Sequence, residues 1–209
     1  MDEEHRCYAG VLFHALRDVV ALKNRQADLV VAVGYDPVEF NFESWMPEVP
    51  LVHIDTVACD IDREVYRTVC DVVGNPESAL NRLLALDSVD SVWDMDALRE
   101  RREAMFARFE PKEGVFGPLS VLKILREVLP DEGIMTCDVG AHTHLIGQAW
   151  RTRHPFGQLM TNGWSSMGFG IPAALGAKLA RPEVPVVCIT GDGGYMMMAG
   201  EMATARRIG

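Results

Sequence analysis

The sequence predicts an α/β protein built on parallel β-sheets, and three observations support this fold class. Short, mostly apolar runs end at a glycine or an acidic residue, as the buried strands of a parallel sheet do. Amphipathic stretches with helical spacing stand between these runs. The length of 209 residues allows one large or two small domains, and 48% hydrophobic residues is a globular composition.

Residues 1–87 are predicted to form part of one α/β domain. Residues 29–33 form an expected buried strand that ends in a glycine turn, and a second short strand ends at Asp55. A helix is expected to open at Asn75 or Pro76. Its apolar residues at helical spacing are Ala79, Leu80, Leu83 and Leu84.

A charged stretch, residues 88–115, is predicted to be a helical connector, and residues 116–209 to form a second domain. This second domain twice repeats the order strand, glycine turn, helix. Its expected elements are a helix from Pro118, a strand ending at Asp138, a helix over 141–150, a small-residue helix over 167–180, a strand over 184–190 and a helix over 195–208. In an open parallel sheet, ligands bind at the carboxyl ends of the strands, where both glycine turns are expected.

The charge distribution restricts the possible partners. A net charge of −10 argues against nucleic acid, because binding a phosphate backbone requires clustered Lys and Arg. Residues 1–115 hold 12 Lys and Arg against 23 Asp and Glu, whereas residues 116–209 hold 8 against 7. An anionic cofactor is therefore expected in the second segment.

The sequence predicts no membrane partner and a cytoplasmic location. No run of 18 apolar residues is present, and the acidic opening is unlike the basic and then apolar start of a secretory signal. The five cysteines are scattered, without a C-x-x-C pair, so neither a zinc site nor a disulfide framework is expected. They are predicted to be buried free thiols.

Residues 191–194, Gly-Asp-Gly-Gly, follow an expected strand and precede an expected helix. The glycines allow backbone conformations closed to other residues and a close approach of N–H groups to a ligand. Phosphate suits a helix N-terminus, but Asp192 would repel it unless a divalent cation lies between them. These residues predict a magnesium-diphosphate site. The alternative is a tight turn in which Asp192 only caps the helix.

Other nucleotide motifs fit poorly. The chain has no G-x-x-x-x-G-K-[ST] sequence, and the segment GFGIPAALGA places proline where a dinucleotide-binding turn would need glycine. Both observations argue against a nucleoside triphosphate or a nicotinamide cofactor.

Residues 161–207 resemble the cofactor-binding domain of thiamine-diphosphate enzymes, above all the acetolactate synthase group. Three motifs carry the resemblance in order: M-G-x-G-x-P-A-A-x-G-A, then G-D-G, then M-x-x-x-E-x-x-T-A. The resemblance implies thiamine diphosphate and Mg²⁺ as cofactors. It also implies an α/β fold of two parallel-sheet layers, a partial central domain followed by a partial thiamine-diphosphate-binding domain.

The resemblance also implies which residues bind the cofactor. Asp192 would be the metal ligand, Met167 would support the bent cofactor rings, and the carbonyl of Ser165 would receive the pyrimidine amino group. His142 lies in an earlier turn and would contact phosphate. The complete set of cofactor-binding residues is His142, Ser165, Met167, Gly191, Asp192, Gly193 and Gly194.

The first segment resembles the central domain of the same enzymes, and its GYDPVE sequence is closest to the catabolic acetolactate synthases. Relatives that carry FAD have an arginine-containing segment at this place. Because Tyr35, Asp36 and Pro37 stand there instead, FAD binding is not expected.

The implied function is that of part of a 2-oxo acid decarboxylase and carboligase, with acetolactate synthase, which converts pyruvate to acetolactate and CO₂, as the leading candidate. A simple 2-oxo acid decarboxylase is one alternative. The other is a non-catalytic fragment that binds cofactor weakly or associates with other subunits. The full-length form is expected to be a homo-oligomer, either a dimer or a tetramer, acting on a small 2-oxo acid.

The resemblance further implies that the chain is truncated at both ends. In the family, an asparagine metal ligand lies downstream of the G-D-G turn. The catalytic glutamate belongs to an N-terminal domain supplied by a partner subunit. No catalytic residue is therefore assigned here, and the chain alone is expected to be inactive.

Overall fold

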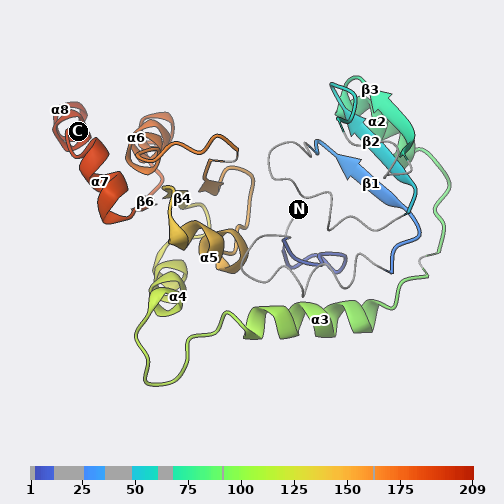
Figure 1. The fold of residues 1–209 in the computed structure, drawn as a ribbon, viewed down its shortest axis with the longest axis horizontal. Helices are drawn as coiled ribbons and strands as arrows, with labels where there is room; N and C mark the ends of the chain where they lie inside the picture. The colour runs from blue at the N-terminus through green and yellow to red at the C-terminus, as the bar shows by residue number, and fades with distance from the viewer. Residues whose placement is uncertain (1–2, 12–25, 36–48, 61–67, 91, 162) are drawn as a thin grey trace. The chain divides into compact units, whose positions relative to one another are not determined.

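The computed structural model is a mixed α/β protein that divides into two compact units (Figure 1). One unit is Asp18–Trp93, and the other combines Met1–Arg17 with Asp94–Gly209. The residues that the structure describes are 3–11, 26–35, 49–60, 68–90, 92–161 and 163–209. Asp36 and Pro37 of the segment compared with FAD-binding relatives lie outside them. The predicted fold class is confirmed, while the predicted domain boundaries stay predictions.

The unit Asp18–Trp93 contains a three-stranded parallel sheet in the order β1-β2-β3. Its strands are β1 (Val30–Val33), β2 (Leu51–Asp55) and β3 (Thr68–Val73), and β3 was not predicted. The helix α2 (Pro76–Leu84) begins where the sequence indicates, because the side chain of Asn75 accepts a hydrogen bond from the Ser78 N–H at 3.0 Å.

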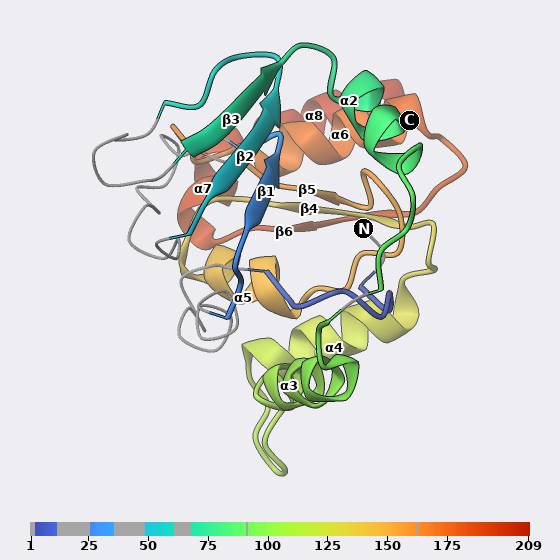
Figure 2. The same cartoon turned by 90° about the vertical axis from the view of Figure 1, so that its right-hand side faces the viewer.

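The larger unit is organised around a second parallel sheet in the order β5-β4-β6. The strands are β4 (Ile134–Cys137), β5 (Gln158–Leu159) and β6 (Val186–Ile189). Figure 2 shows helices on both faces of this sheet. All four residues of the central strand β4 are therefore buried, as expected for a parallel strand covered on both sides.

One face of this sheet packs against α4 (Pro118–Val128) and α5 (Ala141–Ala149), both of which the sequence predicts. The main apolar core lies here. Its buried members are Leu122, Met135, Cys137, Ile146 and Trp150. The core joins both helices to β4, so it fixes where α5 begins after the strand.

The opposite face packs against α6 (Gly170–Ala180), the predicted small-residue helix. Ile134 of β4 and Ala177 of α6 are buried in the same cluster as Val184, which precedes β6. Small residues allow the helix to approach the sheet closely. The beginning of α6 is thereby held against β4.

The same unit contains α3 (Met95–Ala107) and residues 3–11. The side-chain amide of Gln148 donates to the carbonyl of Val11 at 3.0 Å, and Arg153 forms an ion pair with Glu4 at 2.7 Å. These contacts connect the start of the chain to α5 and to the residues that follow it.

The last predicted helix is divided in two. The chain forms α7 (Asp192–Met198) and α8 (Glu201–Ile208) instead of one helix over 195–208. The interruption falls at Ala199 and Gly200, and glycine is a poor residue for a helix interior. The helix α7 therefore begins inside the glycine turn, at Asp192, and α8 follows it after the two interrupting residues.

The prediction of buried cysteines is only partly right. All five are free thiols, but Cys7 and Cys70 are exposed, whereas Cys59 and Cys137 are buried and Cys188 is intermediate. Burial raises the pKa of Cys137 to about 12, so this thiol is inert at neutral pH. In the part of the chain that the structure describes, no helix combines the length and apolar character needed to cross a membrane.

Replacing Ile146 with alanine tests whether the core under α5 stabilises this unit. The side chain has no exposed surface, so its truncation leaves a cavity beside β4. We expect the free energy of unfolding in urea to fall by about 2–5 kcal/mol. Val128→Ala is the control, because Val128 is 75% exposed and its truncation should change stability by less than about 0.5 kcal/mol. Equal losses in the two variants would contradict this description of the core.

Candidate cofactor site

Two turns meet at the carboxyl ends of β4 and β6. The strands pair in parallel, with Cys137 opposite Ile189, and the Asp138 N–H donates to the Ile189 carbonyl at 2.9 Å. Residues 138–140 and 190–194 therefore leave the same edge of the sheet. The prediction that both glycine turns lie at this edge is confirmed.

Asp138 occupies the centre of this edge and has no exposed surface. Its Oδ1 accepts the N–H groups of Gly168 at 2.9 Å and Val139 at 2.6 Å. Its Oδ2 accepts the N–H of Gly170 at 3.2 Å and the hydroxyl of Thr190 at 3.3 Å. The carboxylate thus joins the end of β4 to the start of α6 and to the turn after β6.

These hydrogen bonds decide the charge of Asp138. Burial by itself raises the pKa of a carboxyl group, but donation from Gly168, Val139, Gly170 and Thr190 lowers it more. The pKa of Asp138 consequently lies below its usual range. The sequence marked Asp138 only as the end of a strand, since its four donors are distant in sequence or belong to the backbone.

Asp192 is the first residue of α7, and its side chain is exposed. Gly191 is the N-cap, and no side-chain hydrogen bond caps this helix. The alternative in which Asp192 serves as a helix cap is therefore not what the structure shows. Its carboxylate stands at the surface of the turn, where a cation can reach it.

One of the two predicted reasons for the glycines of this turn, the need for unusual backbone angles, is wrong, while the close approach of their N–H groups to a ligand stays a prediction. None of Gly191, Gly193 and Gly194 has a positive φ, so unusual backbone angles do not require them. Glycine is instead needed because a Cβ at positions 193 and 194 would crowd neighbouring side chains. A Cβ on Gly194 would lie 2.7 Å from Asp138 Oδ2, and a Cβ on Gly193 would lie 3.2 Å from Met167 Cε.

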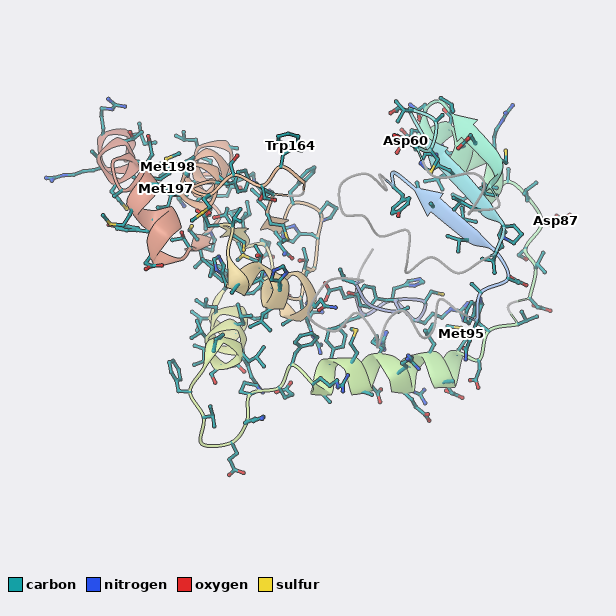
Figure 3. All side chains as sticks on the ribbon, in the orientation of Figure 1. Asp60, Asp87, Met95, Trp164, Met197 and Met198 are labelled. Atoms are coloured by element: carbon teal, nitrogen blue, oxygen red, sulfur yellow. The ribbon has the colours of Figure 1, made fainter. Side chains whose placement is uncertain are left out.

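Residues 163–169 approach the turn from the side of α6. Met167 is 47% exposed, and its methyl group lies against Gly193. The next residue, Gly168, has a φ of +91°, a conformation that favours glycine. Ser165 is exposed, and its hydroxyl donates to the Gly163 carbonyl at 3.1 Å. Figure 3 shows Trp164 on this segment, where it is fully exposed.

His142 lies in the first turn of α5, beside both glycine turns. A Cβ on Gly140 would lie 2.8 Å from its ring, and a Cβ on Gly191 would lie 3.8 Å from it. Its Nε2 is buried and has no hydrogen-bond partner among the described residues. Buried polar atoms are normally satisfied, so this nitrogen is suited to receive a ligand.

The predicted residues fit an anionic cofactor held with the help of a cation. His142 Nε2 has no partner among the described residues, the His142 ring lies near Gly191, and the carboxylate of the next residue, Asp192, is exposed. Within the described residues, no three His, Cys, Asp or Glu side chains gather into a metal site. A cation at Asp192 would therefore take most of its ligands from phosphate and water, as Mg²⁺ does.

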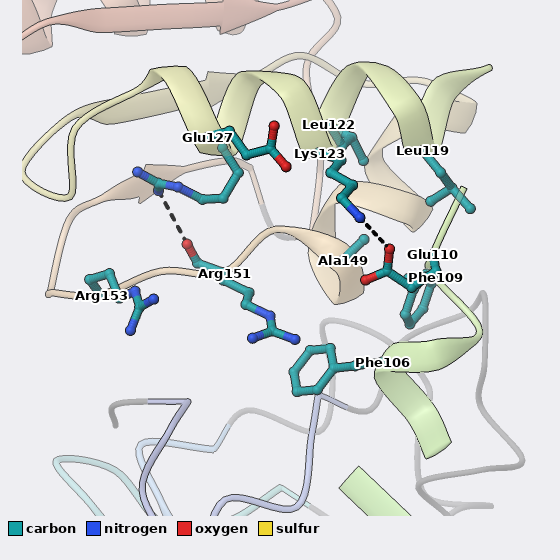
Figure 4. Close-up of a pocket in the computed structure, with 11 residues that line it drawn as sticks. Phe106, Phe109, Glu110, Leu119, Leu122, Lys123, Glu127, Ala149, Arg151 and Arg153 are labelled. Carbon is teal, nitrogen blue, oxygen red and sulfur yellow. Dashed lines mark hydrogen bonds and ion pairs between the residues drawn. The ribbon is translucent and has the colours of Figure 1, made fainter. Parts of the chain in front are cut away.

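A separate hollow of about 320 Å³ lies between the end of α3, α4 and the end of α5 (Figure 4). Several of its charged groups already have partners. Lys123 pairs with Glu110 at 2.7 Å, and Arg126 donates to the Arg151 carbonyl at 3.3 Å. None of the predicted cofactor-binding residues lines it, so we place the candidate site at the glycine turns.

Comparison with protein families identifies the segment that carries these turns. Residues 138–209 match the family described as thiamine pyrophosphate enzyme, C-terminal TPP binding domain. The matched segment is similar to this domain and makes up about a third of the chain. The matched region begins at Asp138 and includes every predicted cofactor-binding residue. The resemblance found through the three sequence motifs is thus confirmed, while the role of each residue stays a prediction.

Curated proteins extend the similarity over most of the chain. The acetolactate synthase of Bacillus subtilis is 30% identical over 195 residues, which is 88% of this chain and 33% of that protein. The probable acetolactate synthase large subunit of Methanocaldococcus jannaschii is 31% identical over 192 residues, 86% of this chain and 32% of its own. The isozyme 2 large subunit of Escherichia coli is 31% identical over 216 residues, 99% of this chain and 38% of its own. The chain therefore spans about a third of the length of these relatives.

Replacing Gly194 with alanine tests the close contact at the turn. The new methyl group would press on Asp138 and Thr190. We expect the free energy of unfolding to fall by about 1–3 kcal/mol. Gly176→Ala is the matched control, because this helical glycine has open space around it and alanine should stabilise the helix by about 0.5–1 kcal/mol. A lower free energy of unfolding for Gly194→Ala together with a higher one for Gly176→Ala would support the contact. Stabilisation of both variants would refute it.

The lowered pKa of Asp138 predicts sensitivity to acid. A carboxyl group whose pKa is lower in the folded state stabilises the protein above its unfolded pKa of about 3.9, and this contribution is lost as the pH falls through the folded value. The free energy of unfolding of Asp138→Asn should differ from that of the unchanged protein by a constant amount from about pH 7 to pH 5. The difference should shrink below about pH 4, as followed by urea titration. A difference that stays constant to about pH 2 would contradict the assignment.

Proposed function

We propose that this chain is part of a thiamine-diphosphate-dependent 2-oxo acid decarboxylase and carboligase, and specifically of an acetolactate synthase. One observation supports this most strongly. The unsatisfied His142 Nε2, the glycine turn 191–194 and the exposed Asp192 occur together at the carboxyl edge of a parallel sheet, inside the segment that matches a TPP binding domain. The relatives are named acetolactate synthases, which supports this choice, and the reaction that we propose is the conversion of pyruvate to acetolactate and CO₂.

In this proposal the chain's residues hold and orient the cofactor. Asp192 would help to hold Mg²⁺ with the diphosphate, and His142 Nε2 would donate a hydrogen bond to a phosphate oxygen. Met167 would support the thiazolium and pyrimidine rings, and the carbonyl of Ser165 would receive the pyrimidine amino group. When bound, the cofactor supplies an electron sink for decarboxylation.

The proposal also includes the larger organisation of the protein. Residues 1–87 would be part of the central domain, residues 88–115 a connector and residues 116–209 part of the cofactor domain. The whole enzyme would be a homo-oligomer that acts on a small 2-oxo acid. The catalytic acid is not assigned to any residue of this chain.

Calorimetric titration tests the metal assignment. Thiamine diphosphate is added to the chain in the presence of Mg²⁺, and then to Asp192→Asn. Because a carboxylate ligand is lost, we expect the apparent affinity to fall by about 10–100-fold. Glu201→Gln is the control, since Glu201 also begins a helix but is assigned no contact with the cofactor, and its affinity should be unchanged. Unchanged binding by Asp192→Asn would refute the metal assignment.

An assay with pyruvate separates the candidate reactions. Formation of acetolactate identifies an acetolactate synthase, whereas acetaldehyde with CO₂ identifies a simple decarboxylase. Binding of cofactor without consumption of pyruvate would identify this chain as a cofactor-binding portion that needs other parts of the enzyme for turnover.

A further inference from the structure

We propose that Asp138 is a positioning residue that fixes the ring-facing segment 163–170 to the diphosphate-facing turn 190–194. This inference rests on the proposed function, because it concerns the two segments that would hold the two ends of the cofactor. It assigns no contact between Asp138 and the cofactor. The residue acts through the backbone that it holds.

The hydrogen bonds of Asp138 reach both segments. Gly168 and Gly170 donate to its two oxygens at 2.9 and 3.2 Å, and Thr190 donates to Oδ2 at 3.3 Å. Gly168 directly follows Met167, the residue expected beneath the cofactor rings. One buried carboxylate is therefore bonded to the backbone next to the ring contact and to the residue that opens the diphosphate turn.

Close packing leaves the carboxylate little freedom to move. A Cβ on Gly194 would lie 2.7 Å from Oδ2, and a Cβ on Gly170 would lie 3.1 Å from Asp138 Cβ. Glycine at both positions allows the two segments to approach the same side chain from different directions. A displacement of either segment must therefore move Asp138 or break one of its hydrogen bonds.

The pattern of donors requires an ionised acid at this position. Val139, Gly168, Gly170 and Thr190 all donate, and an ionised carboxylate can only accept. An asparagine would turn an NH₂ group toward at least one N–H or O–H donor. That donor would lose its partner in a buried setting, which destabilises the arrangement. Asp138→Asn should thus loosen both segments without changing side-chain size.

Hydrogen exchange of the chain without cofactor tests the connection directly. In Asp138→Asn we expect amide exchange to accelerate about tenfold or more both at Gly168 and Gly170 and over residues 191–194. Thr136→Val is the matched control. The Thr136 hydroxyl donates to the Gly170 carbonyl at 2.8 Å, so its loss should loosen the start of α6 without affecting the turn 191–194.

Binding measurements test the consequence for the cofactor. For Asp138→Asn we expect the Kd for magnesium thiamine diphosphate to rise about tenfold or more, whereas the Kd for magnesium pyrophosphate should change less than about threefold. Pyrophosphate needs only one of the two segments. Thr190→Val removes the hydroxyl, which lies within hydrogen-bond distance of Asp138 Oδ2 and of the Gly191 carbonyl, with little change of shape, and Thr190→Ser retains it. The valine variant should lose affinity for thiamine diphosphate, whereas the serine variant should keep the affinity of the unchanged chain.

The outcomes separate this inference from the proposed function. If the unchanged chain binds no thiamine diphosphate, the proposed function fails, yet joint acceleration of exchange in both segments would still support the connection through Asp138. Acceleration in only one segment overturns the inference whether or not the cofactor binds. Equal loss of affinity for thiamine diphosphate and pyrophosphate also overturns it. If Asp138→Asn does not fold, the Thr190 variants provide the test. Equal affinities of Thr190→Val and Thr190→Ser for thiamine diphosphate would then overturn the inference.

Discussion

The arrangement of the larger unit depends on one buried charge, the carboxylate of Asp138. An ionised group inside a protein costs several kcal/mol unless hydrogen bonds replace its water. Here three backbone N–H groups and one hydroxyl do so, and they come from three separate segments. The charge is stable only while all three segments stay together. The need to satisfy one carboxylate therefore determines the geometry of the sheet edge.

The parallel sheet explains why these segments can meet at all. The central strand β4 is buried on both faces, between α4 with α5 on one side and α6 on the other. Because β6 runs parallel to β4, the turns after both strands leave at one edge. The core fixes the start of α5, where His142 lies, and the beginning of α6 brings Met167 to the same edge. The packing that stabilises the sheet therefore also positions the residues of the candidate site.

The sequence predicted what local pattern and motif determine. The strand at Leu51–Asp55, the helices from Asn75 and Pro118, and the two glycine turns follow from apolar periodicity and helix-start residues. It did not predict the role of Asp138, because the donors of that residue come together only in the folded chain. Unusual backbone angles were one of two reasons expected for the glycines at 193 and 194, but their φ values are ordinary, and the missing Cβ leaves room for Met167 and Asp138. The strand β5 has two residues, too few for a recognisable pattern.

The contacts between glycines and carboxylate also restrict how this segment can evolve. Gly170 and Gly194 lie so close to Asp138 that a side chain at either position would collide with it or with its partners. At Gly194 the crowding comes from the Asp138 carboxylate and the Thr190 hydroxyl, and at Gly170 it comes from the Asp138 Cβ and backbone nitrogen and from Cys188 Sγ. A larger residue at either position therefore requires a shift of the backbone or of more than one neighbour. We therefore expect Asp138, Gly170 and Gly194 to vary together in related sequences, because a change at one alters the space available to the others.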